Sequence, residues 1–173
     1  MPELTEQDHR LLRRAVSVSA EARSNGNMPF GAILADPTGK ILLEAENTGV
    51  TEANTLFHAE TNLMHMAVSS LSLEQIANAT LYTSCEPCAM CSGTMYWGGI
   101  NRMVYAMGED DLLELTGLHP DNPTMTGVGC RTILNSGQRQ IDVSGPHMIN
   151  EASAVHEGYW TDPAFQYHLS EGQ

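Results

Sequence analysis

Basic residues are scarce in this sequence. Its 173 residues include 8 lysines and arginines against 21 aspartates and glutamates, which gives a formal net charge of −13. Affinity for nucleic acids comes largely from lysine and arginine contacts with phosphates, so a surface of this sign repels a phosphate backbone. The composition therefore argues against a nucleic-acid partner and favours a small uncharged ligand.

Long hydrophobic runs are also missing, and we expect no secretory leader. No apolar run is long enough to span a membrane, and residues 1–6 have neither the basic nor the apolar region of a signal peptide. Of the four cysteines, Cys130 stands alone in a glycine-rich segment, so a disulfide framework is not indicated. We expect a cytoplasmic protein in a reducing compartment, with no membrane partner.

Several familiar enzyme motifs are absent as well. No serine occupies a nucleophile elbow, and the glycines at 93, 98, 99 and 108 do not follow a phosphate-binding spacing. There are no internal repeats. At 18.8 kDa the chain is able to bury a full hydrophobic core by itself, so we predict one domain over residues 1–173.

Hydrophobic periodicity predicts alternating helices and strands. Helices are expected at 5–25, 58–69, 87–96, 109–115 and 150–159, and strands at 29–35, 40–47, 79–84, 102–106 and 140–144. The first two strands form a hairpin around the turn at 36–39. This order indicates an α/β fold with three α/β/α layers and a central mixed five-stranded sheet. Residues 117–140 are predicted to form a long loop, a feature that is usually functional or mobile.

Two short segments bring together the residue types that zinc binds most readily. One is Cys85-Glu-Pro-Cys88-Ala-Met-Cys91, and the other is the tripeptide His58-Ala-Glu60. Cys88 and Cys91 lie three positions apart, which places both on one face of a helix that begins at Pro87. With His58 they form a set of three ligands. Three ligands leave a tetrahedral zinc ion one open position for water, which is typical of a catalytic site.

Glu60 has the position of a general acid/base rather than that of a ligand. It follows His58 by two residues, too displaced to chelate beside it but close enough to exchange protons with a water at the metal. On a helix from about Ala59 it shares a stripe with Leu63 and Ala67, which turns the carboxylate inward. A buried carboxylate is costly unless paired or hydrogen-bonded, so one beside a metal indicates a use in catalysis.

A closed structural zinc site is the alternative interpretation. Cys85, Cys88 and Cys91 are equally spaced and could bind one ion together with His58 as a Cys3His set. The chain would then be a non-catalytic zinc-binding protein. Against this, Cys85 comes at the end of a predicted strand whose direction aims it elsewhere, and Glu60 would have no purpose.

The pattern H-x-E followed by P-C-x-x-C resembles the signature of the zinc-dependent nucleobase deaminases. Further segments are similar to the guanine deaminase and tRNA adenosine deaminase branches of the cytidine deaminase superfamily, and especially to bacterial guanine deaminases. These segments are Pro29-Phe-Gly-Ala32, Asn47, and Thr83-Ser-Cys-Glu-Pro-Cys88 followed by Tyr96-Trp97. The similarity covers residues 10 to about 108 and fades beyond them.

The resemblance implies a cytidine deaminase-like fold, one zinc ion per chain, a homodimer, and hydrolytic removal of an exocyclic amine. Glu60 would move protons from the attacking water to a ring nitrogen and to the leaving amine. The implied substrate is a purine base, with guanine converted to xanthine and ammonia as the first choice. A nucleoside, triazine, pterin or pyrimidine base is the alternative, and a tRNA adenosine deaminase would need a basic groove.

The resemblance also implies a set of substrate-binding residues. Asn47 would hydrogen-bond the base, Phe30, Trp97 and Trp160 would stack on it, and the main chain at Ala59, Ser84, Cys85 and Glu86 would position its polar edge. Phe30 and Trp97 could equally be core aromatics. Guanine deaminases carry an acid where a gap-free match places His119, so the chain departs from the pattern there. Asp121 could take that role after a small shift, and Glu114 and Asp111 are further candidates.

The C-terminal segment from 150 to 173 is unusually aromatic for a chain with 6% aromatic residues. It includes Trp160, Phe165, Tyr167 and His168. Exposed aromatic surface usually marks a binding site or an interface. We predict that this segment forms a lid over the zinc cleft of its own subunit or of a partner, the alternative being a plug at the back of the sheet.

Overall fold

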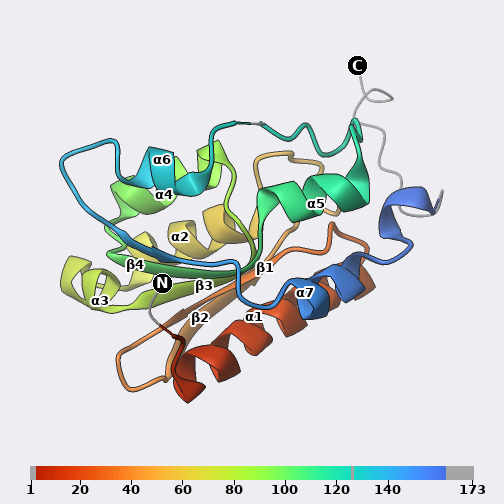
Figure 1. The fold of residues 1–173 in the computed structure, drawn as a ribbon. Coiled ribbons are helices and arrows are strands. Elements are labelled where there is room, and N and C mark those ends of the chain that lie inside the picture. The colour runs from red at the N-terminus through yellow and green to blue at the C-terminus, as the bar shows by residue number, and fades with distance from the viewer. Residues whose placement is uncertain (1–2, 126, 163–173) are drawn as a thin grey trace.

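A mixed sheet of five strands lies between two layers of helices in the computed structural model, which describes residues 3–125 and 127–162 (Figure 1). The strands are β1 (Gly31–Ala35), β2 (Ile41–Glu46), β3 (Thr80–Cys85), β4 (Arg102–Met107) and β5 (Asp142–Ser144), in the order β2-β1-β3-β4-β5. Strand β1 pairs antiparallel with β2 and β3, whereas β3, β4 and β5 are parallel. The predicted hairpin and mixed sheet are confirmed.

The helices cover the two faces of the sheet unequally. They are α1 (Glu6–Ser24), α2 (Ala59–Ser70), α3 (Leu73–Asn78), α4 (Ala89–Gly98), α5 (Glu109–Thr116), α6 (Cys130–Leu134), α7 (Ile149–His156) and the 3-10 turn η1 (Tyr159–Thr161). Figure 1 shows α1 and α7 on one face and α2, α4 and α6 on the other. Each face has its own apolar core, so the predicted three-layer arrangement is confirmed.

Helix α1 forms where its sequence pattern places it. Thr5 and Asp8 form a capping box, in which the Thr5 hydroxyl accepts a hydrogen bond from the Asp8 N–H and the Asp8 carboxylate accepts one from the Thr5 N–H. Leu11, Ala15 and Ala22 lie on its buried stripe against the sheet. This helix seals the face of the sheet opposite the zinc motif.

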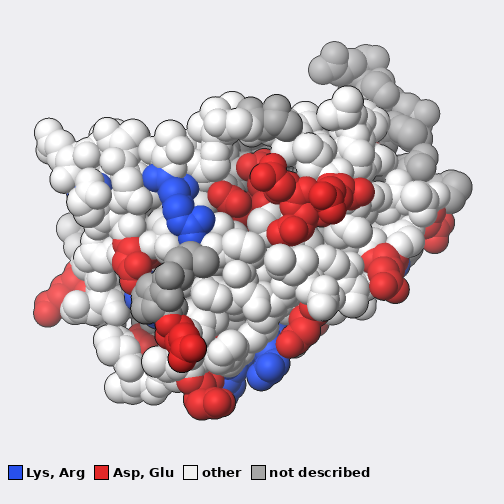
Figure 2. Space-filling view, viewed as in Figure 1, with Lys and Arg blue, Asp and Glu red and all other residues white. Residues whose placement is uncertain are grey.

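The carboxyl ends of β3 and β4 lie side by side at one edge of the structure, because these strands are parallel and Cys85 pairs with Met107. The zinc motif continues directly from the end of β3, and α5 continues from the end of β4. Ligands in open α/β sheets bind outside the carboxyl ends of the strands. Acidic side chains gather over α5, whose exposed acids are Asp110 and Glu114 (Figure 2).

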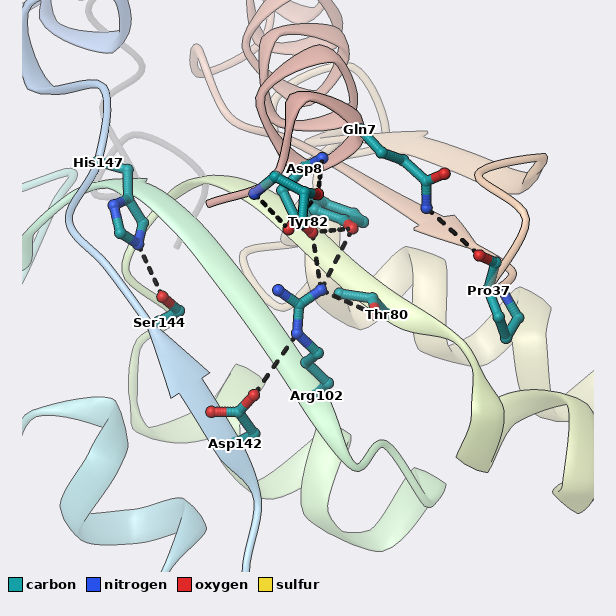
Figure 3. A network of polar contacts seen from close by, with 10 residues as sticks. Gln7, Asp8, Pro37, Thr80, Tyr82, Arg102, Asp142, Ser144 and His147 are labelled. Carbon is teal, nitrogen blue, oxygen red and sulfur yellow. Dashed lines mark hydrogen bonds and ion pairs between the residues drawn. The ribbon is translucent and has the colours of Figure 1, made fainter. Parts of the chain in front are cut away.

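The opposite, amino end of these strands is held by a buried polar network (Figure 3). Asp8 accepts hydrogen bonds from the Tyr82 hydroxyl at 2.7 Å and from Arg102 Nη1 at 2.8 Å, and Asp142 forms an ion pair with Arg102 Nε at 3.5 Å. The network ties α1 to β3, β4 and β5. Burial alone would raise the pKa of Asp8, but the hydrogen bonds from Arg102 and Tyr82 lower it well below its usual range.

Two helices were not predicted. Helix α3 occupies a segment that reads as a turn from the sequence, and it is started by a capping box between Ser72 and Gln75. Helix α6 interrupts the predicted loop at 117–140. These helices have six and five residues, too few for a helical period to be visible in the sequence. None of the described helices combines the length and the apolar character required to cross a bilayer.

Candidate active site

Three side chains converge at the start of two helices. His58 is the N-cap residue of α2, Cys88 is the N-cap residue of α4, and Cys91 lies in the first turn of α4. The Nδ1 atom of His58 lies 3.7 Å from the Sγ atom of Cys88 and 3.6 Å from that of Cys91. Their ligand atoms all lie within 4.8 Å of one another, so the predicted ligand set is brought together.

The helix start differs by two residues from the prediction. Helix α4 begins at Ala89 rather than at Pro87, and Cys88 has an extended backbone with φ −62° and ψ 174°. The two thiols therefore do not share a helical face in the predicted way. They still meet, because an N-cap side chain turns back over the first turn that it precedes, where Cys91 lies.

The donor set fits a zinc ion. Zinc bonds of about 2.3 Å to sulfur and about 2.0 Å to nitrogen, at a tetrahedral angle, place the two donor atoms roughly 3.6 Å apart. The distances from His58 match this separation. The Cys88 sulfur accepts hydrogen bonds from the Cys91 thiol and from His58, which lower the pKa of Cys88 well below its usual range, so Cys88 already favours the thiolate form.

Cys85 does not complete a closed site. Among the described residues, the group of His, Cys, Asp and Glu side chains that could hold a metal consists of His58, Cys88 and Cys91. Cys85 ends β3, and burial raises the pKa of its thiol well above the usual value. The structure therefore does not provide Cys85 as the fourth ligand that a closed Cys3His site requires. All four cysteines are free.

Glu60 lies beside this cluster in a dry setting. Its side chain is buried on α2 with Leu63, Met64 and Ala67, as the stripe pattern predicts. The Thr83 hydroxyl donates a hydrogen bond of 2.5 Å to Glu60 Oε1. Burial raises the pKa of Glu60, while the Thr83 hydrogen bond opposes that rise. A raised pKa favours proton exchange near neutral pH.

A cavity of about 340 Å³ opens over the cluster and Glu60. Its wall combines apolar surface with a few polar groups, as small-molecule sites do. Apart from the metal-binding cluster and Glu60, the main apolar members are Met28, Phe30, Leu56, Met90 and Leu112, and the main polar members are Asn47, Glu86, Glu109, Asp121, Asn122 and Thr124.

Asn47 presents a hydrogen-bond donor to the cavity. Its side chain is buried, and its Oδ1 atom accepts a hydrogen bond of 2.9 Å from the Gly49 N–H. Because Gly49 requires an acceptor, this bond fixes the orientation of the amide and leaves the Nδ2 group toward the cavity. The Nδ2 group has no hydrogen-bond partner among the described residues.

Asp121 lines the cavity and His119 lies behind it. The Nδ1 atom of His119 accepts a hydrogen bond of 3.2 Å from the Asp121 N–H, and its ring packs edge-on against Trp160 with the centroids 5.4 Å apart. Of the two candidates at this departure from the family pattern, Asp121 is the one in the wall. His119 is absent from the described residues that line the cavity.

Trp160 is a buried support for the cavity rather than part of its surface. It is 6% exposed, its indole N–H donates a hydrogen bond of 3.1 Å to His156 Nδ1, and its ring lies 6.3 Å from that of Phe30. Burial lowers the pKa of His156 to about 4, which keeps this cluster neutral. Trp160 therefore lies behind the cavity wall at Phe30, and the choice between a lid and a plug stays a prediction. The predicted lid residues Phe165, Tyr167 and His168 lie outside the described residues.

Trp97 is the clearest departure from the predicted set. It is 87% exposed and packs edge-on against Tyr96, and it does not belong to the described residues that line the cavity. The physical reason is distance along α4, because Trp97 lies nine positions after Cys88 and a helix rises about 1.5 Å per residue. This placement gives no support to stacking of Trp97 on a base in its own subunit, and that role stays a prediction.

The remaining predicted positions lie next to the cavity or in its wall. Cys85 and Glu86 line it, whereas Ala59 and Ser84 are buried beside it. The Ser84 hydroxyl accepts a hydrogen bond of 3.1 Å from the Gly31 N–H, which ties β3 to β1. Roles for the main chain at Ala59 and Ser84 stay predictions.

Sequence reasoning missed Glu109 and the wall formed by residues 122–125. Glu109 is the first residue of α5, and burial, with the charges of Glu86 and Cys88, raises its pKa to about 7. Its position directly after a parallel strand was a usable signal, because such positions meet at the ligand-binding edge of a sheet.

Comparisons with known proteins agree with this geometry. Residues 5–107 match the family model of the cytidine and deoxycytidylate deaminase zinc-binding region. The chain belongs to this deaminase family. Its predicted zinc requirement and enzyme class are thereby confirmed as those of a zinc-dependent hydrolytic deaminase.

Individual relatives differ in how much of the chain they match. A protein from Schizosaccharomyces pombe described as a probable cytosine deaminase is 37% identical over 158 residues, which cover 91% of this chain and 95% of that protein. Guanine deaminase from Bacillus subtilis is 36% identical over 104 residues, 60% of this chain and 66% of that protein. The solved guanine deaminase from Nitrosomonas europaea shares the fold, with a TM-score of 0.74 at 20% identity over 94% of this chain and 88% of its own.

Proposed function

We propose that this deaminase hydrolyses the exocyclic amino group of a free nucleobase. The observation that carries the proposal is the burial of Glu60 beside the His58, Cys88 and Cys91 cluster, at a cavity with few polar groups. A buried carboxylate next to a candidate zinc site has the position required of a proton shuttle. When bound, zinc supplies an acidified water as the nucleophile.

The reaction replaces the amino group by the oxygen of water and releases ammonia. Glu60 accepts a proton from the attacking water and gives it to the ring nitrogen next to the reacting carbon. It then delivers the second proton of the water to the amine, which leaves as ammonia as the carbon–nitrogen bond breaks. Thr83 holds the Glu60 carboxylate in place through its hydrogen bond of 2.5 Å.

The size of the cavity favours a base over a larger ligand. Small-molecule sites range from about 300 to about 1,000 Å³, and this cavity of about 340 Å³ is near the lower end. Phe30, Leu56 and Leu112 provide apolar surface for a flat ring. A nucleotide would also bring phosphates to a wall that contains Glu86, Glu109 and Asp121, where like charges repel.

Asn47 favours a base with a carbonyl oxygen. Its Nδ2 group is a donor. Cytosine and guanine each carry a ring carbonyl that is separated by one ring nitrogen from the carbon bearing the amino group. Adenine has no carbonyl oxygen to accept this hydrogen bond. The acidic surface over α5 further disfavours tRNA as a substrate (Figure 2).

Cytosine is the first candidate and guanine the second. The match to the probable cytosine deaminase covers 91% of this chain. It therefore extends over the cavity wall at 121–125. Guanine, the substrate predicted from the sequence, is favoured by the Bacillus subtilis relative, whose match covers 60% of the chain. The departure at His119 from the guanine deaminase pattern weakens the second candidate.

Ammonia release from a panel of bases tests the proposal. Purified zinc-loaded protein is given cytosine, guanine, adenine, isocytosine, a triazine, a pterin, and the nucleosides of the first three bases. Turnover of cytosine at a kcat/KM at least about tenfold above that of its nucleoside is expected. Release from a nucleoside or a tRNA hairpin in preference to every free base would contradict the proposal.

We further propose a homodimer in the cytoplasm, as the resemblance implies. The exposed Trp97 supports the dimer, because large exposed aromatic groups commonly mark an interface. Sedimentation of the wild-type protein and of Trp97→Ala measures the state of association, and monomeric wild-type protein at micromolar concentration would contradict it.

A further inference from the structure

Two helices at the cavity begin with glycine as their N-cap residue. Helix α5 follows Gly108, and helix α6 follows Gly129. Helices start best when a side-chain oxygen at the N-cap accepts a hydrogen bond from a first-turn N–H group. Glycine has no such oxygen. In α5 the Asp111 carboxylate accepts a hydrogen bond of 2.9 Å from the N–H of Gly108 itself, but the first N–H group inside each helix still needs an acceptor from elsewhere in the chain.

Glu86 supplies that acceptor to both helices. Its Oε1 atom accepts a hydrogen bond of 2.9 Å from the Cys130 N–H, and its Oε2 atom accepts one of 3.3 Å from the Glu109 N–H. A carboxylate at a helix N-terminus also gains from the partial positive charge of the helix dipole. One side chain therefore caps α5 and α6 together.

The absence of a side chain at Gly129 leaves room for this contact. A Cβ atom at position 129 would lie 3.2 Å from Glu86 Oε1, closer than ordinary van der Waals contact. The N–H of Glu86 in turn donates a hydrogen bond of 2.7 Å to the Met107 carbonyl, which fixes Glu86 to the end of β4. The main chain of Glu86 is thus fixed to β4, and its carboxylate is in close contact with the starts of both helices.

The chain between these two hydrogen bonds forms one wall of the cavity. Its two ends, Glu109 and Cys130, are both hydrogen-bonded to the Glu86 carboxylate, and residues 121–125 between them line the cavity. Glu86 itself lies two residues before the ligand Cys88. The same residue therefore connects the metal-binding turn to the wall that faces the substrate.

We propose that Glu86 is a positioning residue that sets the distance between the zinc cluster and the substrate wall at 121–125. Glu86 itself lines the cavity, but both of its carboxylate oxygens are engaged by helix N–H groups, so we assign its action to holding the wall at 121–125. This inference rests on the proposed function for the part that concerns substrate affinity. The double capping itself does not depend on any reaction.

The test compares Glu86→Ala and Glu86→Gln with Glu74→Gln. Glutamine keeps one acceptor oxygen and loses the other, whereas alanine loses both. Glu74 is an exposed acid in the first turn of α3, so its variant controls for the loss of charge at a helix start. Each protein is assayed for zinc content, for amide hydrogen exchange at residues 109–131, and for kcat and KM with the best base of the panel.

We expect a graded effect confined to the wall. Amide exchange should accelerate at both Glu109 and Cys130 in Glu86→Ala, and at one of them in Glu86→Gln. In the alanine variant KM should rise by about tenfold, which corresponds to the free energy of one lost helix cap, while kcat changes less than about threefold. Zinc content and the control variant match the wild type. Glutamine restores part of the affinity.

Two results would overturn the inference. Unchanged exchange at Glu109 and Cys130 in both variants would show that Glu86 caps neither helix. Faster exchange with an unchanged KM would show that the wall does not position the substrate. If wild-type protein deaminates none of the bases, the proposed function fails, and the exchange measurement still decides separately whether Glu86 holds the two helices.

Discussion

Thr83 Oγ1 lies 2.5 Å from Glu60 Oε1, and both side chains are buried between β3 and α2. The hydroxyl gives the carboxylate a hydrogen bond that offsets part of the cost of its burial. It also fixes the rotamer of Glu60. The two residues meet because β3 leads into the zinc motif while α2 begins at Ala59, directly after His58.

Removal of this hydroxyl is expected to lower turnover without removing the metal. Thr83→Val keeps the shape of the side chain but leaves the buried carboxylate without its donor, so kcat should fall by about tenfold. Thr83→Ser keeps the hydroxyl and should retain most of the activity. Steady-state kinetics with zinc analysis measures both, and equal rates for the valine and serine variants would contradict the role of the hydrogen bond.

Metal binding should depend on two thiolates and not on three. We expect about one zinc per chain in the wild type and in Cys85→Ser, and a loss of zinc in Cys88→Ser and Cys91→Ser. Absorption spectra of cobalt-substituted protein report the number of thiolate ligands directly. A three-thiolate spectrum that changes in Cys85→Ser would restore the closed Cys3His site.

Asn47 is expected to control substrate affinity through a single donor. Asn47→Asp is close in shape but replaces the Nδ2 donor with an acceptor, so KM for cytosine or guanine should rise by about tenfold or more while zinc stays bound. Thermal unfolding provides the control, because the retained oxygen still accepts from the Gly49 N–H. An unchanged KM would remove Asn47 from the substrate site.

The network around Asp8 makes a prediction about stability and pH. The pKa of Asp8 is lower in the folded protein than in the unfolded chain, so its contribution is complete above the ordinary value of about 4 and is lost as the pH falls below it. Tyr82→Phe should lower the free energy of unfolding by about 1 kcal/mol at pH 7.

Asp8→Asn should lower the free energy of unfolding by about 2 kcal/mol at pH 7, because Arg102 loses its charged partner. The partial exposure of Arg102 limits this loss, since solvent screens the ion pair. The gap between this variant and the wild type should close as the pH falls below about 4. Denaturant unfolding at several pH values measures both effects. A gap that persists unchanged at pH 3 would contradict the assignment.

The catalytic half of the site could be predicted because its residues are close in the sequence. His58 and Glu60 are separated by one residue and Cys88 and Cys91 by two, so a local pattern identifies them before any fold is known. The same locality predicts the buried stripe of α2. Periodicity likewise predicts the five strands and the long helices, because each buries a continuous apolar face.

The substrate half depends on contacts that local patterns do not contain. Asp121 and Thr124 reach the cavity through an irregular segment whose path is set by Glu86, more than thirty residues earlier. The resemblance places Trp97 on the base, whereas the length of α4 carries it away from the zinc end of that helix. Capping of a helix by a carboxylate that is distant in the sequence produces no local sequence pattern from which it could be predicted.

The most direct measurement of the central claim is ammonia release by wild-type protein and by Glu60→Gln at equal zinc content. Glutamine is nearly isosteric but transfers no proton, and general acid/base groups contribute about 10²–10⁴-fold. The account predicts that the wild type converts a free base to its oxo product with one ammonia per base, and that Glu60→Gln keeps the zinc and the fold but loses turnover by at least about a hundredfold. Near-normal turnover in zinc-loaded Glu60→Gln would contradict it.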